Sequence, residues 1–161
     1  MKILVLGHTG SGKTTAAKLI AKMIESPPPR NCSDFIIEDY AMESTDSPVK
    51  ASNLIKKIIA NKNDYRQDLF KYGLGRQAKD PAYPISEAVN HTDVVTGART
   101  KENLDAARSL FSTVVWIDRV AAKSGGTDKL TPDHADIVID NNGTFKELED
   151  NIRMALIRSD M

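Results

Sequence analysis

The chain has 161 residues, a length that fits one domain with a sizeable core, so we treat residues 1–161 as a single domain. Lys and Arg total 22, and Asp and Glu also total 22; this balance argues against a protein that coats nucleic acid, although it leaves room for a local basic patch. The single cysteine, Cys32, excludes an intrachain disulfide and favours a reducing compartment. No apolar stretch reaches the roughly 18 residues that a spanning helix needs, so we expect a cytoplasmic protein without a membrane segment.

In the first half of the chain, apolar runs alternate with helical patterns. Residues 2–6 predict a buried strand, and the helical spacing after them predicts a helix that ends before the prolines at 27–29. Residues 35–37 predict a second strand, which ends at Glu38 and Asp39. The next predicted elements are a polar loop over 40–49 and two helices, the first marked by Leu54, Ile55, Ile58 and Ile59 and the second by Tyr65, Leu69 and Tyr72, with its end at Gly73 or Gly75.

The second half predicts three more strands and two more helices. The strands are the apolar runs at residues 93–96, 113–117 and 136–139. The helices are marked by Leu104, Ala107 and Phe111 and by Leu148, Ile152 and Leu156, the latter opened by a capping box of Thr144 and Glu147. Residues 119–130 are polar and predict a loop.

Strands that alternate with helices along the whole chain predict an α/β fold in three layers, with a five-stranded parallel sheet between two layers of helices. In such sheets, ligands bind beyond the carboxyl ends of the strands. Four charged residues end or follow a predicted strand and are therefore expected around one crevice: Asp39, Arg99, Arg119 and Asp140.

Residues 7–14 match the phosphate-loop pattern G-x-x-x-x-G-K-[ST] in full, with a predicted strand before them and a predicted helix after them. In this pattern the backbone N–H groups and the positive end of the helix face the phosphates of ATP. Lys13 is expected to reach the β- and γ-phosphates, and the Thr14 hydroxyl is expected to coordinate Mg²⁺. The residues expected to contact ATP here are Gly7, Thr9, Gly10, Ser11, Gly12, Lys13, Thr14 and Thr15.

A phosphate loop by itself occurs in kinases, GTPases and ATPase motors. A GTPase would need D-x-x-G after the third strand and an N-K-x-D motif, and neither occurs in the sequence. A motor usually carries an acid at the end of an apolar strand, whereas Asp93 begins one. We therefore expect a kinase that uses ATP and Mg²⁺; the alternative is a nucleotide-binding regulatory module without transfer activity.

Phosphoryl transfer needs positive charge around the transferring group, and the planar guanidinium of arginine binds phosphate oxygens bidentately. The candidates are Arg66, Arg76, Arg99 and Arg119. An acid at the end of the second strand, Asp39, would orient or deprotonate the acceptor or hold Mg²⁺ through water, and Glu38 takes this role if the strand shifts by one residue. The candidate catalytic residues are Lys13, Asp39, Arg99 and Arg119.

Five segments, in this order, carry a resemblance to known proteins: residues 7–14, 66–76, 94–102, 115–119 and 136–143. They resemble the nucleoside monophosphate kinase group, and most closely the phage-type deoxynucleoside monophosphate kinases. The resemblance covers nearly the whole chain. It implies a P-loop kinase fold and transfer of the γ-phosphate of ATP to a (deoxy)nucleoside monophosphate in deoxynucleotide metabolism.

By this resemblance, Arg99 and Arg76 hold the acceptor phosphate, and Arg119 belongs to a short lid over residues 119–130 that closes on ATP. Asn141, in the loop after the last strand, would lie near the adenine. The residues expected on the acceptor side are Asp39, Arg66, Arg76 and Arg99. Two alternatives stay open: a kinase that acts on a 5-hydroxymethyl-pyrimidine base in phage DNA, and a dephospho-coenzyme A-type kinase. The expected partners are ATP and a nucleotide acceptor, in a monomer or a homodimer.

Overall fold

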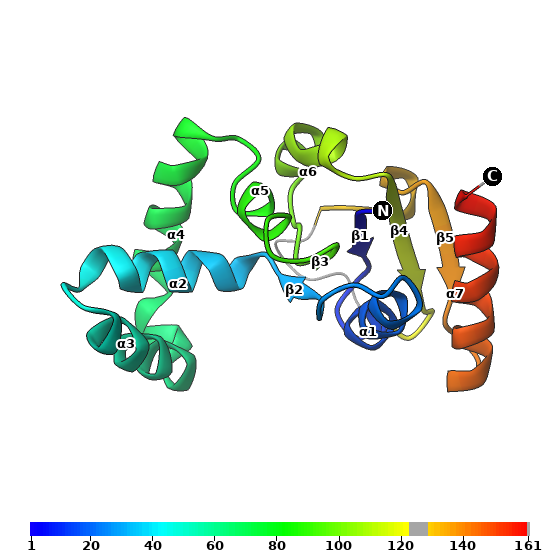
Figure 1. Ribbon diagram of the computed structural model, residues 1–161, viewed down its shortest axis with the longest axis horizontal. Helices are drawn as coiled ribbons and strands as arrows, with labels where there is room; N and C mark the ends of the chain where they lie inside the picture. Colours follow the sequence, from blue (N-terminus) through cyan, green and yellow to red (C-terminus); the bar gives the residue numbers. More distant parts are fainter. Residues whose placement is uncertain (123–128, 161) are drawn as a thin grey trace.

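The computed structural model describes residues 1–122 and 129–160, and its centre is a five-stranded sheet (Figure 1). The strands stand in the order β2-β3-β1-β4-β5, and every neighbouring pair is parallel. They are β1 (Ile3–Leu6), β2 (Arg30–Asn31), β3 (Val94–Thr96), β4 (Thr113–Asp118) and β5 (Ile137–Asp140). The predicted five-stranded parallel sheet is therefore confirmed, and four of the strands lie where the apolar runs place them.

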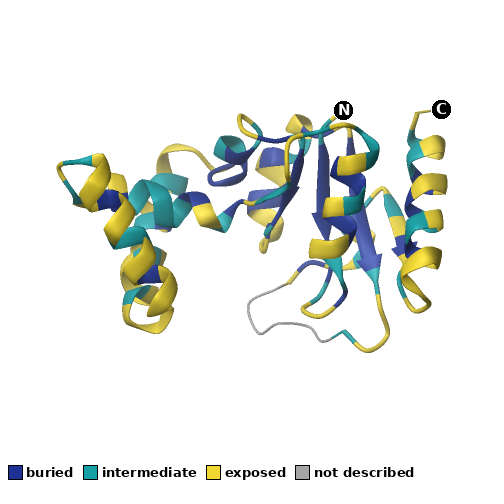
Figure 2. Ribbon diagram, turned by 60° about the horizontal axis from the view of Figure 1, so that its bottom comes forward, coloured by how far each residue is buried: buried dark blue, intermediate teal, exposed yellow. Residues whose placement is uncertain are grey.

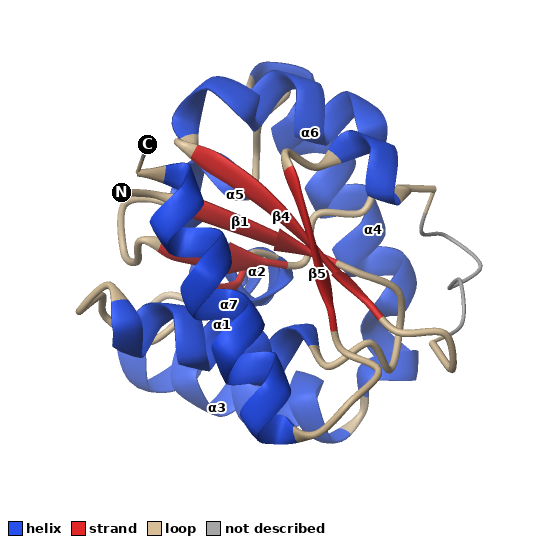
Figure 3. Ribbon diagram, turned by 90° about the vertical axis from the view of Figure 1, so that its right-hand side faces the viewer, coloured by secondary structure: helices blue, strands red, loops and turns tan. Residues whose placement is uncertain are grey.

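Helices cover both faces of the sheet, as Figure 3 shows. They are α1 (Lys13–Met23), α2 (Ser33–Ser44), α3 (Pro48–Ala60), α4 (Lys62–Lys79), α5 (Ile85–Ala88), α6 (Lys101–Ala107) and α7 (Phe145–Ser159), with short 3₁₀ helices η1 (Arg108–Leu110) and η2 (Pro132–His134). Ile20 of α1 and Ile152 of α7 pack on one face, whereas Leu104 of α6 packs on the other. The predicted three-layer α/β/α arrangement is confirmed.

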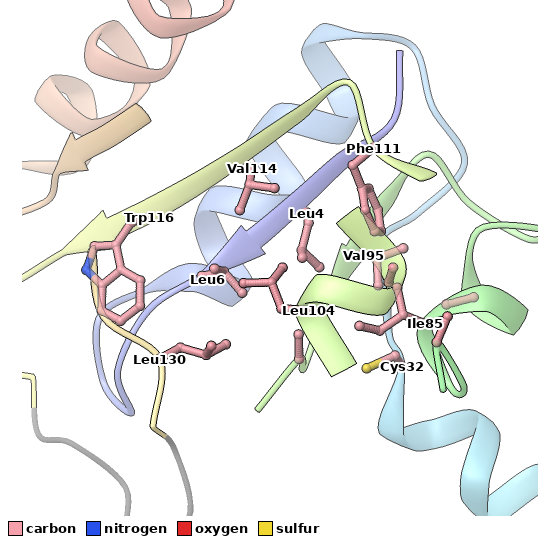
Figure 4. Packing of buried hydrophobic residues seen from close by; sticks show 14 of the residues in the cluster. Leu4, Leu6, Cys32, Ile85, Val95, Leu104, Phe111, Val114, Trp116 and Leu130 are labelled. Atoms are coloured by element: carbon pink, nitrogen blue, oxygen red, sulfur yellow. The ribbon is translucent and has the colours of Figure 1, made fainter. Parts of the chain in front are cut away.

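The central strand β1 contributes to both halves of the hydrophobic core. Ile3 and Val5 face α1 and α7, whereas Leu4 and Leu6 face α6, because successive residues of a strand point to opposite sides. Figure 4 shows the second half, where Leu4 and Leu6 lie near Leu104. Full burial of such a side chain contributes roughly 1.5–3 kcal/mol, so four of them hold β1 firmly in the middle of the sheet.

The predicted second strand at residues 35–37 is wrong, because these residues belong to α2. Phe35 is buried there, and Ile36 packs near Gly73 of α4. Three apolar residues fit a helix face as well as a strand, so the pattern cannot choose between them. The real strand β2 has only two residues, directly after the prolines at 27–29, and is too short to show a period.

The predicted loop at residues 40–49 is wrong for most of its length. Residues 40–44 continue α2, and α3 begins at Pro48. Ser47 caps α3, since its hydroxyl accepts a hydrogen bond from the Lys50 N–H at 3.2 Å. Serine followed by proline is a helix-start signal in this position, because serine favours the N-cap and proline the first helical residue.

The helix predicted from Tyr65, Leu69 and Tyr72 continues beyond its expected end. α4 passes through Gly73 and Gly75 and ends only at Lys79. A glycine inside a helix costs about 1 kcal/mol relative to alanine, which packing can offset. The short helix α5 follows, in a region where no element was expected.

Helices α2, α3 and α4 extend away from the sheet, as Figures 1 and 2 show, and we call residues 33–79 the helical arm. The three helices pack on one another, with Ala41, Ala51 and Ile58 buried among them. The outward surfaces of α3 and α4 are largely exposed (Figure 2). Within the described residues, no helix is both long and apolar enough to cross a membrane.

Candidate active site

The phosphate loop joins the end of β1 to the start of α1, as the motif predicts. Its backbone turns sharply at Gly10 and Gly12, with φ angles of 83° and 87°, where residues other than glycine are strained. Gly12 also lies against the side-chain amide of Asn141, which occupies the space that a Cβ atom would take. The Ser11 N–H donates to the His8 carbonyl at 3.1 Å and closes the turn.

The interior of this loop is polar and electropositive. The Lys13 ammonium donates to the Gly7 carbonyl at 2.7 Å, and α1 has no acidic residue in its first turn to neutralise its positive end. Among the described residues, the buried Ser11 hydroxyl and the buried Nδ1 of His8 have no hydrogen-bond partner. Buried polar groups are normally satisfied, so these two fit a site that is completed by a polar ligand.

A magnesium ion fits this loop through Thr14. Its side chain is exposed in the first turn of α1, and a hydroxyl oxygen is a ligand that Mg²⁺ accepts. The described residues contain no group of three or more His, Cys, Asp or Glu side chains that would form a cage for a metal. Mg²⁺ usually keeps several waters and binds with substrate phosphates, so a single protein hydroxyl suits it.

The phosphate loop lies at the topological switch point of the sheet, between β1 and β3. The helix after β1 lies on one face and the helix after the neighbouring strand β3 lies on the other, so a crevice opens between the carboxyl ends of these strands. Gly97, with φ of 95°, directly follows β3 and lies against the Asn31 side chain of β2. Arg99 follows two residues later with an exposed side chain. The structure thus places Arg99 and the phosphate loop at adjacent strand ends.

Cys32 lies directly before α2, next to the end of β3. Its N–H donates to the Thr96 carbonyl at 2.8 Å, and its side chain is buried in the core that Figure 4 shows. Burial raises the pKa of the thiol to about 12, and the nearby positive charge of Arg99 opposes this rise. The thiol is therefore neutral at pH 7 and supplies packing, whereas the Arg99 side chain supplies charge at the start of α2.

The segment expected to form the lid begins and ends close to the site. Arg119 follows β4 with an exposed side chain, and its carbonyl accepts a hydrogen bond from the Ala122 N–H at 2.9 Å. Of the predicted lid at residues 119–130, the part from 123 to 128 lies outside the described residues. At the other end, the Lys129 N–H donates to the Arg99 carbonyl at 3.4 Å and Leu130 is buried near Trp116 (Figure 4).

Asn141 supports the phosphate loop. Its Nδ2 donates to the Ser11 carbonyl at 2.7 Å, and its backbone N–H donates to the Asp118 carbonyl at 2.8 Å. These two bonds connect the ends of β4 and β5 to the loop after β1. The side-chain amide is thus engaged with the protein, and a contact from Asn141 to adenine stays a prediction.

Asp39 does not end a strand, so the reason for placing it at the sheet edge is wrong. It lies in the second turn of α2, seven residues after Cys32, or about 10 Å along the helix axis. The Tyr83 hydroxyl donates to Asp39 Oδ2 at 2.8 Å, and Arg76 Nη1 lies 3.9 Å from the same oxygen. The competing acid, Glu38, instead pairs with Arg30 at 2.6 Å. The two carboxylates therefore have separate partners.

Arg76 is the centre of a compact polar cluster between α2, α4 and the segment before α5. Its Nη1 lies 3.3 Å from Glu43 Oε1 and donates to the Tyr72 hydroxyl at 2.9 Å, and its guanidinium lies 4.6 Å from the centre of the Tyr83 ring. Burial, together with the hydrogen bond to Asp39, raises the pKa of Tyr83. We call Asp39, Glu43, Tyr72, Arg76 and Tyr83 the acceptor-side cluster.

The cluster is tied to the sheet edge through Asn103. Its side-chain amide donates to the carbonyls of Pro81 and Tyr83, both at 2.9 Å, and it lies in α6, which begins just after Arg99. Arg99 and the cluster are therefore held on neighbouring parts of one framework. A ligand whose anionic group meets Arg99 could extend along α2 toward Asp39.

Arg66 is not brought to this site. It is exposed on α4, ten residues before Arg76, which is about 15 Å along the helix axis. Sequence reasoning also missed Asn31 and Asp34, which flank the true end of β2, and Tyr83. Asn31 closes a local turn there, since its Oδ1 accepts hydrogen bonds from the Ser33 N–H and hydroxyl. The signal in the sequence that could have indicated this site was an Asn and an Asp in the short segment after the prolines at 27–29.

No protein-family model matches the chain, and no curated protein matches it in sequence. The fold is similar to that of two crystal structures of shikimate kinases. The protein from Aquifex aeolicus VF5 matches 100% of this chain and 99% of its own chain, with a TM-score of 0.57 and 17% sequence identity. The protein from Bacteroides thetaiotaomicron matches the same shares of both chains, with a TM-score of 0.52 and 11% identity. The chain therefore has the P-loop kinase fold, and these neighbours do not belong to the phage-type group that the sequence resembles.

Proposed function

We propose that this protein is an ATP-dependent kinase that transfers the γ-phosphate to a (deoxy)nucleoside monophosphate. The observation that carries the proposal is the complete phosphate loop at the switch point of the sheet, beside the exposed guanidinium of Arg99. A crevice with one anion site at each wall suits a reaction that brings two phosphates together. Such a reaction needs positioning and positive charge and little covalent chemistry from the protein.

On the ATP side, the loop N–H groups and Lys13 bind the phosphates, and Lys13 stabilises the charge that develops on the transferring group. The Thr14 hydroxyl would hold Mg²⁺ together with ATP and water, and the ion would supply positive charge to the phosphates. Arg119 leaves β4 next to the loop and would approach the γ-phosphate when its segment closes. The second end of this segment is anchored, because Leu130 is buried and the Lys129 N–H donates to the Arg99 carbonyl.

On the acceptor side, Arg99 holds the acceptor phosphate, and the acceptor-side cluster meets the sugar or the base. A monophosphate ester has its second pKa near 6, so its oxygens are mostly ionised at neutral pH and attack without a general base. Asp39 then acts as a positioning residue that orients Arg76 and Tyr83. This division of labour matches the geometry, because Asp39 stands about 10 Å along α2 from Cys32.

A hydroxylated carboxylic acid is the second candidate acceptor. The two neighbouring structures are shikimate kinases, and a guanidinium such as Arg99 binds a carboxylate as well as a phosphate. A hydroxyl acceptor loses its proton during transfer, so that reaction needs a base, which the exposed Asp34 in the first turn of α2 or Asp39 in the second turn would supply. The need for one of these carboxylates as a base therefore distinguishes the two acceptors.

The test is transfer from γ-labelled ATP to a panel of acceptors in the presence of Mg²⁺. The panel contains the ribo- and deoxyribonucleoside monophosphates, shikimate, dephospho-coenzyme A and DNA with 5-hydroxymethyl-pyrimidines. Lys13→Ala is the matched control, because it removes the phosphate-binding ammonium. Phosphorylation of a free monophosphate supports the proposal, and label on another acceptor alone replaces it. ATP binding without transfer to any acceptor would favour a regulatory module.

A further inference from the structure

The formal charge of zero hides a strong separation of charge along the chain. Helices α3 and α4, residues 48–79, hold eight basic residues: Lys50, Lys56, Lys57, Lys62, Arg66, Lys71, Arg76 and Lys79. The same stretch holds only two acidic residues, Asp64 and Asp68, so its formal charge is +6. The remainder of the chain must then carry −6. The positive charge is thus gathered on the outer part of the helical arm.

Most of these cations have no acid to neutralise them. Within the described residues, ion pairs involve only Lys50, with Asp46, and Arg76, with the acceptor-side cluster. The side chains of Lys56, Lys57, Lys62, Arg66, Lys71 and Lys79 are exposed and form no ion pair with a described residue.

Helix α7 shows the usual arrangement of surface charge. Its Lys146 pairs with Asp150 and its Arg153 with Glu149, each across one helical turn. In such pairs the opposite charges on one helix neutralise each other locally. Helices α3 and α4 lack this compensation, so their electrostatic field is directed outward.

One face of α4 also carries an exposed aromatic ring between basic side chains. Arg66, Gln67, Phe70 and Lys71 line one shallow depression on this face. The Phe70 side chain is 67% exposed, and Leu74, one turn further, is 50% exposed. A single exposed ring is common on protein surfaces, but a ring among unpaired basic side chains is placed to stack on a ligand that those charges attract.

We propose that the outer face of α3 and α4 binds single-stranded nucleic acid. Unpaired lysines and arginines neutralise successive phosphates, and an exposed aromatic ring stacks on an unpaired base of any identity. Duplex DNA has its bases stacked on each other, so Phe70 would gain little from it. A membrane surface fits less well, because the acidic side chains of Asp64 and Asp68 share the helix of Phe70 and Leu74.

The acceptor-side cluster lies further along the same helix, since Arg76 follows Phe70 by six residues, about 9 Å along the helix axis. Nucleic acid on the arm would therefore run toward the place where we expect the acceptor. The binding itself does not depend on the proposed phosphoryl transfer. It is expected to persist in Lys13→Ala, so failure of one proposal can be told from failure of the other.

The experiment measures fluorescence anisotropy of a labelled oligothymidylate with the full-length protein over a series of salt concentrations. We expect binding at low salt, with log K falling linearly with log[salt] by about 0.7 for each phosphate contacted. Lys56→Glu with Lys57→Glu should weaken binding at least 10-fold and flatten this slope. Phe70→Ala should weaken binding roughly 5- to 150-fold with an unchanged slope, because stacking contributes about 1–3 kcal/mol per base. Phe70→Tyr should bind like the wild type.

The matched control is Lys146→Glu with Arg153→Glu on α7, which changes the net charge by the same amount. It should retain at least half of the wild-type affinity. Circular dichroism confirms folding, and Arg66→Gln with Lys71→Gln repeats the test on α4 without charge reversal. Absence of binding by the wild type at low salt overturns the proposal, as does an equal loss in the α7 control. Binding to anionic lipid vesicles but not to the oligonucleotide would also overturn it.

Discussion

Lys13 occupies the first position of α1, where its ammonium and the positive end of the helix point into the same loop. Both are expected to act on the phosphates of ATP, and the ammonium is expected to reach the γ-phosphate, where charge develops during transfer. We expect Lys13→Ala to lower kcat by at least about 10²–10³, the usual cost of removing one donor aimed at a transition state. Steady-state kinetics measures the effect. Lys18→Ala, an exposed change on the same helix, is the control, and equal losses in both variants would argue against the loop.

Arg99 presents its guanidinium at the end of β3, next to a glycine that lets a ligand approach the backbone. Loss of one charged hydrogen-bonding partner costs roughly 1.5–3 kcal/mol, so Arg99→Ala should raise the KM of the acceptor about 10- to 150-fold. The KM of ATP should stay unchanged. Arg99→Lys should restore little, because an ammonium cannot form the planar fork. A raised KM for ATP alone would move Arg99 to the ATP side of the crevice.

Asp39 accepts a hydrogen bond from the Tyr83 hydroxyl and lies 3.9 Å from Arg76, so its negative charge orients these two side chains. With a monophosphate acceptor, Asp39→Asn should raise the KM of the acceptor and leave the pH profile of kcat unchanged. A fall in kcat on the order of 100-fold, with a lost basic limb in the profile, would instead make Asp39 a general base. Glu38→Gln is the control, because Glu38 pairs with Arg30 and not with the cluster.

At the scale of elements, the loop between β1 and α1 depends on its neighbour after β5. Asn141 donates to the Ser11 carbonyl at 2.7 Å, and no other side chain within the described residues is seen to bond to that carbonyl. We expect Asn141→Ala to raise the KM of ATP roughly 2- to 10-fold, in line with about 1 ± 0.5 kcal/mol for one hydrogen bond. Asn151→Ala removes a comparable bond to the Asp140 carbonyl and should leave the KM of ATP unchanged. Equal effects of both changes would contradict a specific support of the loop.

Elements that the sequence predicts well are those whose signal is local. The phosphate loop, β1 and α1 could be assigned because glycines, a lysine and an apolar run stand in fixed order within residues 2–26. The end of β2 could not be assigned from the sequence, since a two-residue strand has no period and its position depends on pairing with β3. Phe35 shows the error that followed. Its apolar neighbours suggested a strand, and the error moved Asp39 from a helix to a sheet edge.

Contacts between distant segments explain what else was missed at the site. Tyr83 reaches Asp39 only because the chain returns from α4 past α2, and Asn103 holds that return by two carbonyl groups. Neither residue belongs to a motif, and 44 positions separate Tyr83 from Asp39. The positions of Arg99 and Arg119 were easier to predict, because a parallel sheet brings the carboxyl ends of all its strands to one edge. Arg66 lies on α4 about 15 Å along the helix axis before Arg76, and its predicted place on the acceptor side stays a prediction.

At the scale of the whole molecule, the charge is separated within the helical arm. Helices α3 and α4 carry +6 and the remainder of the neutral chain carries −6, of which −5 lies in residues 33–47, in α2 and the turn after it. Attraction of polyanions is therefore expected at α3 and α4 themselves, on the side away from α2. The polar acceptor-side cluster lies where the two parts join. Recognition of nucleic acid and binding of the acceptor are therefore expected at adjoining places.

Ligand binding should stabilise the whole fold, because the phosphate loop connects β1, α1 and, through Asn141, β5. At a Mg²⁺–ATP concentration 100 times its Kd, the native state gains about 2.7 kcal/mol, which raises Tm by roughly 5–10 °C for a chain of this size. Differential scanning fluorimetry measures the shift. Removal of Mg²⁺ with EDTA should reduce the shift, since Thr14 and the phosphates then lose their shared ion, and Lys13→Ala should abolish most of it. The control Lys18→Ala should keep the full shift. A wild-type protein whose Tm does not respond to Mg²⁺–ATP would contradict the assignment of the loop, whatever the acceptor.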